Sequence, residues 1–223
     1  MPFKKRVYVA IFCCIFYPVS AAAEFSIGGG PEGGFSFEKT AGASSMLIAP
    51  GAAVSLFSTP EDSIIGLFFH FSFLFPVLLE KKTGGTEAKV DLSYYDFLFQ
   101  ASALLGAGFR FDVGGAFRLN LGVGPEIFGL LARAEKKSDL YSAYNYSLSS
   151  LNIGIGTVVE ISLEALAPFY IALGTVLSYN FLNYTVVSSP NINQNGWAKE
   201  YALFSVRPYI CFGYHFESSN EDD

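Results

Sequence analysis

The segment from 64 to 79, IIGLFFHFSFLFPVLL, places a large apolar side chain at every second position. The interleaved positions include Gly66, His70, Ser72 and Pro76. A helix would spread these residues around its circumference, whereas a strand collects them on one face because successive side chains point to opposite sides. The segment therefore predicts a long β-strand with one apolar face and one face that tolerates water.

The same alternation recurs in eight segments of the chain. In the fifth segment, for example, Phe117 and Leu119 alternate with Arg118. A soluble eight-stranded barrel such as a lipocalin would aggregate with so many Phe and Leu outside, and a helical bundle needs apolar spans of ~20 residues that the mature chain lacks. We therefore expect an all-β, eight-stranded antiparallel up-and-down transmembrane β-barrel whose apolar face meets lipid. Its strands are expected near 25–38, 45–58, 63–80, 92–112, 116–135, 148–165, 169–187 and 201–216.

The connections between these segments alternate in length. Tight turns follow the second, fourth and sixth segments, at 59–62, 113–115 and 167–168, where Pro and Gly favour turn geometry. Longer polar connections, around KKTGGTEAK, EKKSDLYSAYNY and SSPNINQNGWAKE, follow the third, fifth and seventh, and only the first connection, KTAGAS, breaks the pattern. Short turns and both termini on one side, with long loops on the other, are typical of bacterial outer-membrane barrels.

The N-terminus predicts export. Lys4, Lys5 and Arg6 precede an apolar stretch from Val7 to Val19, and Ala21–Ala23 form a small-residue cleavage site. A retained helical anchor is the weaker interpretation, because the apolar stretch is short and Pro18 interrupts it. We expect a signal peptide at 1–23, a barrel at 24–216 and an acidic tail at 217–223.

Charge and cysteine content exclude further classes. Removing the three basic residues of the signal from the 14 Lys and Arg leaves 11 against 20 Asp and Glu, a formal charge of −9, which argues against a nucleic-acid partner. The mature chain keeps one cysteine, Cys211, so no disulfide can form within it. The barrel must be held together by other means.

The last strand, YICFGYHF at 209–216, alternates aromatic residues and ends on Phe216. With the eight-segment pattern, this strand resembles the small eight-stranded outer-membrane barrels, the group of OmpW, OmpX and the OmpA transmembrane domain. The resemblance implies an outer-membrane location, lipid contact and recognition of the last strand by the outer-membrane assembly machinery. This strand departs from the pattern of that group in two ways. Gly213 lies unusually close to its end, and the acidic tail follows Phe216.

Ionisable residues on the inner faces are expected to form a luminal charge network, since an isolated buried charge is costly. If the first and last strands meet, Glu32 and Arg207 become neighbours. The network either plugs the lumen or gates a narrow conduit. Gly30-Pro31-Glu32 and Gly124-Pro125-Glu126 predict a bulge or kink, either a lateral opening or a device for curvature. The expected members are Glu32, Glu126, Glu160, Arg110, Arg118, Arg207 and His70.

Two functions follow from the resemblance. An OmpW-like barrel would be a narrow porin-like pore or conduit for small or hydrophobic solutes, whereas an OmpX-like barrel would bind an extracellular partner through its loops. Aromatic residues dominate binding hot spots, so the loop contact candidates are Tyr141, Tyr144, Tyr146 and Trp197.

No motif indicates a cofactor, and two His residues are too few for a metal site. His70 and Ser72 show a His-x-Ser spacing known in outer-membrane deacylases, but their neighbours do not match, and we expect no enzyme.

Overall fold

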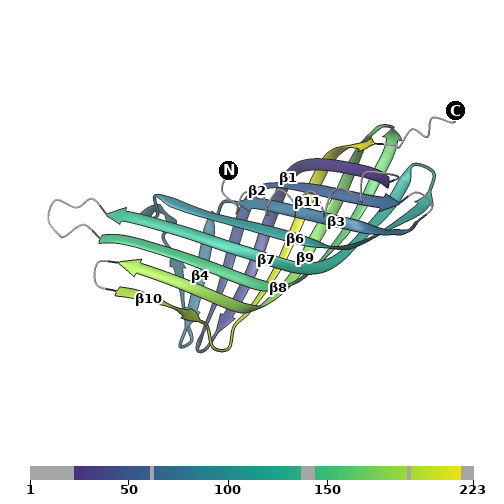
Figure 1. Ribbon diagram of the computed structural model, residues 1–223. Helices are drawn as coiled ribbons and strands as arrows, with labels where there is room; N and C mark the ends of the chain where they lie inside the picture. Colours follow the sequence, from purple (N-terminus) through teal and green to yellow (C-terminus); the bar gives the residue numbers. More distant parts are fainter. Residues whose placement is uncertain (1–22, 61–62, 137–143, 190–191, 217–223) are drawn as a thin grey trace, which may run out of the picture.

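The computed structural model describes residues 23–60, 63–136, 144–189 and 192–216 (Figure 1). These residues form an antiparallel sheet and one short 3-10 helix, η2 (Leu92–Tyr94). The strands are β1 (Ala23–Thr40), β2 (Ala43–Pro60), β3 (Ile65–Leu74), β4 (Leu78–Thr83), β5 (Thr86–Val90), β6 (Phe97–Gly114), β7 (Phe117–Lys136), β8 (Tyr144–Leu166), β9 (Phe169–Ser189), β10 (Ile192–Trp197) and β11 (Ala202–Phe216).

The sheet closes on itself. Strand β1 pairs with β2 along its whole length and also with β11, from Phe25 opposite Phe216 to Lys39 opposite Ala202. The ring runs β1-β11-β9-β8-β7-β6-β3-β2 and back to β1, while β4, β5 and β10 extend it at one end. The prediction of an eight-stranded antiparallel barrel is confirmed.

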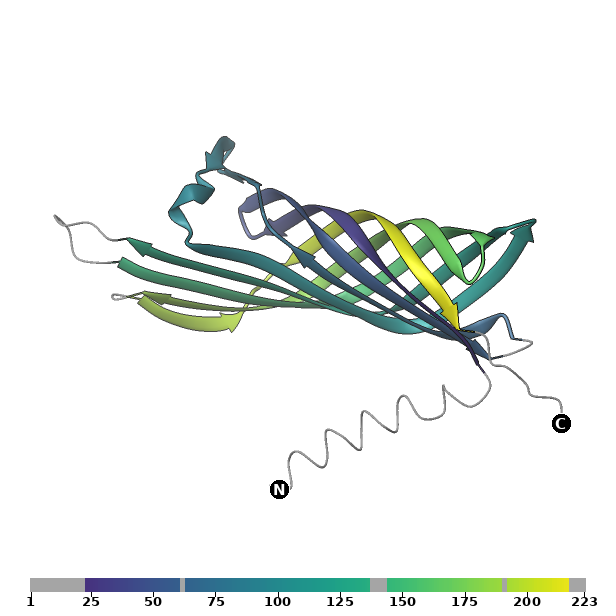
Figure 2. The ribbon, with the colours of Figure 1, turned by 90° about the horizontal axis from the view of Figure 1, so that it is seen from above.

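The two ends of the barrel differ. One, the turn end, holds both ends of the described chain and the turn between β6 and β7. There Gly114 and Gly115 have φ of 118° and 62°, values that residues with side chains rarely adopt. The other, the loop end, holds the β4–β5 hairpin and β10. Figures 1 and 2 show β7, β8 and β9 projecting beyond the rest of the barrel there. In outer-membrane barrels the long loops face outside the cell.

The two faces of each strand match the alternation. On β3, Leu67 and Phe73 are 46% and 44% exposed, whereas His70 and Ser72 are 1% and 0% exposed. Exposed Phe, Leu, Ile and Val side chains continue around the ring on every long strand. Such a surface would not stay dispersed in water, so it requires lipid.

The third predicted strand is interrupted at Phe75–Val77. The backbone N–H groups of Phe75 and Val77 donate to Pro50 and Ile48 of β2, at 2.8 and 2.9 Å. Since N–H groups alternate in direction along a strand, residue 76 should donate toward β6, but Pro76 has no N–H. The pairing with β6 therefore stops at Leu74, opposite Gln100.

Two predicted segments differ further from the structure. The fourth strand begins at Phe97 rather than near 92, because Asp91 accepts a hydrogen bond from Ser93 N at 3.0 Å and starts η2. The polar connection KKTGGTEAK forms the β4–β5 hairpin, in which Lys82 donates to Glu87 at 2.8 Å. This hydrogen bond lowers the pKa of the exposed Glu87 carboxyl.

The Gly-Pro-Glu triplets interrupt the ladder without producing bulges. Between β1 and β11 the pairing is interrupted after Gly29 and again after Glu32, opposite Pro208, and the register is unchanged where it resumes. Between β6 and β7 it stops at Glu126 and resumes at Val123, again in the same register. Each proline lacks an N–H donor, which accounts for the gap in the ladder. Because the register is unchanged, the bulge offered as one alternative is wrong at both sites.

Candidate functional site: a vestibule above a sealed lumen

Arg207 lies at the centre of the lumen and is fully buried. Its guanidinium donates to Ser102 Oγ of β6 and to Glu126 Oε1 of β7, and its Nε lies 3.6 Å from Glu32 Oε1 of β1. Glu126 also accepts from Asn180 Nδ2 of β9 at 3.1 Å. One cation thus ties together strands from opposite sides of the barrel.

Glu32 also connects this arginine to His70. His70 Nε2 lies 3.4 Å from Glu32 Oε2, and its Nδ1 lies 2.7 Å from Ser55 Oγ of β2. We call Glu32, His70, Ser102, Glu126 and Arg207 the plug. Its side chains span the lumen, and the four that carry titratable groups are at most 3% exposed.

Glu160 takes part in no ion pair among the described residues. Its carboxylate accepts from Asn120 Nδ2 and from the Tyr209 hydroxyl, both at 2.8 Å. Tyr209 belongs to an apolar cluster that fills the lumen below the plug, in which the rings of Phe57 and Phe68 are stacked with centroids 5.7 Å apart. Polar hydrogen bonds, not a cation, therefore satisfy this carboxylate.

Arg110 and Arg118 form a separate cluster at the turn end. Arg110 donates to Glu24 at 2.8 Å and to Ser26 at 3.0 Å, and Arg118 contacts Glu24, Asp112 and Glu164 at 3.6, 2.9 and 3.1 Å. The seven predicted network residues therefore do not form one network. Five lie at or near the plug, and these two arginines neutralise acids at the mouth.

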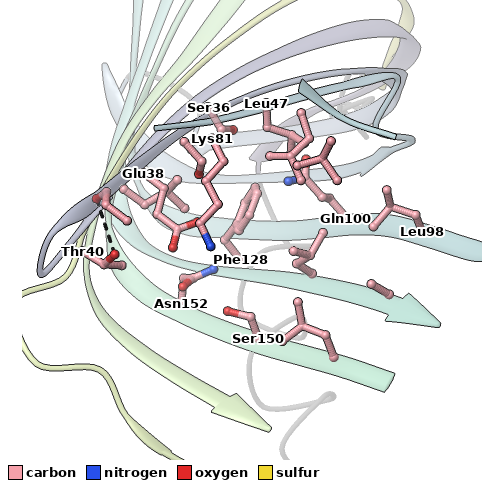
Figure 3. Close-up of a pocket in the computed structure, with 18 of the residues that line it drawn as sticks. Ser36, Glu38, Thr40, Leu47, Lys81, Leu98, Gln100, Phe128, Ser150 and Asn152 are labelled. Atoms are coloured by element: carbon pink, nitrogen blue, oxygen red, sulfur yellow. Dashed lines mark hydrogen bonds between the residues drawn. The ribbon is translucent and has the colours of Figure 1, made fainter. Parts of the chain in front are cut away.

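A cavity of about 330 Å³, which we call the vestibule, occupies the lumen at the loop end (Figure 3). Thr40 and Ala43, which flank the β1–β2 turn, lie at its rim, so it opens toward the loops. Phe128 lines its base, and the guanidinium of Arg207 lies 6.0 Å from the centre of that ring. Most of the wall is apolar, including Leu47, Leu79, Leu98, Leu130, Leu148 and Leu203.

Few ionisable side chains line the vestibule. Glu38 of β1 and Lys81 of β4 point into it from the two strands that flank β2, with Ser45 of β2 between them in the register (Figure 3). Three tyrosines, Asn152, Gln100 and several serines add uncharged polar groups to the wall. The wall is thus amphipathic, with apolar and polar side chains together and with one carboxylate and one amine.

The vestibule also borders a break in the barrel wall, which we call the fork. Above the Leu74–Gln100 pair, β4 pairs with β2 and β5, whereas Phe97–Phe99 of β6 pair with β7; no β4–β6 pairing occurs among the described residues. Leu79 of β4 and Leu98 of β6 line the vestibule on the two sides of the fork. Outside it, exposed Phe75, Val77 and Phe97 belong to the apolar belt.

The loop contact candidates fall in different places. Tyr146 lines the vestibule, and Trp197 of β10 is 59% exposed and packs against Tyr184, with ring centroids 5.2 Å apart. Tyr141 lies outside the described residues, and Tyr144 is the first residue of β8.

Several residues of the site were not singled out from the sequence. Gln100, Asn120 and Glu164 occur on the polar faces of predicted strands, but alternation does not say which polar residues meet across a lumen. Lys81 lies in a segment predicted as a loop, and so no face could be assigned to it. Among the described residues no group of three His, Cys, Asp or Glu side chains could hold a metal ion.

A closed antiparallel ring, an apolar exterior and a polar interior define this chain as a transmembrane β-barrel of the outer-membrane class. Comparison with family models and with curated proteins finds no match. Among solved structures, the chain is similar to a major outer membrane protein of Thermus thermophilus, with 12% identity, a TM-score of 0.57 and coverage of 87% of this chain and 100% of that one. It is also similar to OprG of Pseudomonas aeruginosa, with 15% identity, a TM-score of 0.55 and coverage of 88% and 97%. The fold is that of small outer-membrane barrels.

Proposed function

We propose that this barrel is a conduit for small apolar solutes, which would reach the vestibule from outside the cell and leave it sideways through the fork. The observation that supports this most directly is the position of the vestibule. It is closed below by the plug, and at its side lies the fork, where β5 covers the second edge of β4 and no pairing joins β4 or β5 to β6 among the described residues. A partly apolar chamber beside the apolar belt would give an apolar solute a lateral path that does not pass through the plug.

A straight pore is a poorer fit to the geometry. The plug and the apolar cluster beneath it contain Arg207, Phe68 and Leu104, each at most 2% exposed. Eight-stranded barrels have interiors just wide enough for side chains to fill. A solute moving along the axis would have to displace a buried charge network, which is costly to open.

The direct test is to fill the vestibule. Ala132 of β7 is 4% exposed and lines the chamber, so Ala132→Trp should occupy it and slow the uptake of N-phenyl-1-naphthylamine into vesicles with a lipopolysaccharide outer leaflet. Ala101→Trp is the matched control, because Ala101 pairs with Phe73 on the lipid face of β6. Equal uptake by the native protein and the Ala132→Trp variant would refute the proposal.

A further inference from the structure

One polar atom in the vestibule lacks a partner. Gln100 is 2% exposed, and its Oε1 accepts no hydrogen bond from any described residue. The side chain lines the vestibule (Figure 3). A buried acceptor without a donor is costly, and folded proteins contain few such atoms. A group that donates to this oxygen would therefore be stabilised there.

Gln100 lies at the floor of the vestibule. It forms the last β3–β6 pair below the fork, with Leu74. Ser102, two residues along on the same face of β6, contacts Arg207 of the plug. Phe128, beneath which the guanidinium lies, lines the same floor. A flat apolar solute resting on this ring would bring its polar edge near Gln100.

The vestibule also contains a strong donor. The ammonium group of Lys81 reaches into the chamber beside Glu38 (Figure 3). A hydroxyl group can donate to one atom and accept from another at once, so it can satisfy the free acceptor and still accept a hydrogen bond from a donor of the wall. A hydrocarbon of the same shape can do neither, and it would leave Gln100 Oε1 unpaired.

We infer that the vestibule prefers small apolar solutes that carry a hydroxyl group, such as an aromatic alcohol, over the matching hydrocarbon. The inference rests on the proposed function, because it assigns a solute class to the same chamber. A site that hydrogen-bonds a hydroxyl rejects the analogue that lacks it, whereas a purely apolar pocket discriminates weakly against a solute with an added hydroxyl. Gln100 is then a residue that determines specificity.

The test compares 2-naphthol with naphthalene. Saturable binding of each is measured by fluorescence at known free aqueous concentration, with the protein in lipid nanodiscs, and the affinity ratio is compared between the native chain and Gln100→Leu. Because both proteins sit in the same lipid, partitioning into the bilayer cancels. We expect the preference for 2-naphthol to fall about tenfold in the variant, the usual value of one hydrogen bond in a buried site.

Controls separate selectivity from folding. Gln194→Leu makes the same exchange on exposed β10 and should leave the ratio unchanged. Gln100→Met offers a second apolar replacement of similar length, and folding of each variant is checked by heat-modifiable gel mobility. The same ratio in the native chain and both Gln100 variants, with saturable binding kept, would overturn the hydroxyl preference and leave the conduit intact. No saturable binding of either solute to the native chain would overturn both.

Discussion

Arg207 contacts two glutamates that come from opposite sides of the ring, and all three side chains are shielded from water. Removing one partner of a buried pair leaves an uncompensated charge, which destabilises a protein by about 3–5 kcal/mol. We expect Arg207→Met to lower the free energy of unfolding by about this amount. Urea titration of the barrel in lipid vesicles measures the change.

The double variant tests whether the charge itself is responsible. Adding Glu126→Gln to Arg207→Met removes one of the two stranded carboxylates and should recover part of the loss, because coupled sites are not additive. Lys89→Met, on the exposed β5 strand, removes a cation that lies far from the plug and should change stability little. Strictly additive losses for Arg207 and Glu126 would show that the pair is not coupled.

Neighbouring residues on β3 should respond in opposite ways to a positive charge. Phe71 faces lipid, and Ser72 is fully buried in the lumen opposite Ser102 of β6. An arginine on the lipid face near the midplane costs about 2–4 kcal/mol, whereas a luminal one can meet water or a carboxylate. Phe71→Arg should therefore reduce the yield of heat-modifiable barrel more than Ser72→Arg. A similar yield from both would contradict the assignment of faces.

For individual residues, the sequence indicates which side chains face the lumen but not which of them contact one another. Alternation places Glu32, Glu126 and Arg207 on inner faces, and closure of the ring brings Glu32 to the strand beside Arg207. The contact from Arg207 to Glu126 crosses the lumen, so it depends on strand tilt and stagger, which no local pattern encodes. The same reason explains why Arg110 and Arg118 were grouped with a plug that they do not reach.

Among the elements, the interruption between β3 and β4 determines where the barrel wall divides. Pro76 stands where the next backbone donor toward β6 would lie, and the fork starts there. Pro76→Val restores an N–H and a residue that favours strands. One added hydrogen bond is worth about 1 kcal/mol, and it would extend the β3–β6 pairing by one position and narrow the fork. Uptake of N-phenyl-1-naphthylamine should fall accordingly.

A matched exchange elsewhere separates the fork from general rigidity. Pro208 lies in β11, at the interrupted β1–β11 seam and away from the vestibule lining. Pro208→Val should leave uptake unchanged. If it slowed uptake as much as Pro76→Val, the fork would not be the exit.

Strand positions could be predicted because period-2 alternation extends over each long strand, as from Phe117 to Ile127 of β7. The β4–β5 hairpin and β10 could not, because their polar, charged residues show no apolar face and lie beyond the apolar belt. Pro76 was visible in the sequence, yet it sits in an otherwise regular strand. Its consequence depends on which neighbour its missing N–H would have faced, and this becomes clear only when the pairing is known.

At the scale of the whole molecule, the proposed function requires separate polar and apolar routes. An axial route would pass through the plug, whereas the proposed lateral route would pass through the vestibule and the fork. The native barrel should therefore show no steady ion conductance in planar bilayers, because buried side chains fill the lumen below the vestibule. A variant that weakens only one route should leave the other unchanged.

Glu32→Ala combined with Arg207→Ala removes two of the longest side chains from the plug and leaves Glu126 without its cation. We expect water and small ions to enter this space, so that ion conductance rises while the uptake of N-phenyl-1-naphthylamine stays at the native level. Ala132→Trp should do the reverse, with reduced uptake and no conductance. The reason is geometric: the two sets of residues lie on different paths that share only the vestibule floor. Steady conductance by the native barrel, or loss of uptake in the plug variant with its fold intact, would show that a single path serves both ions and apolar solutes.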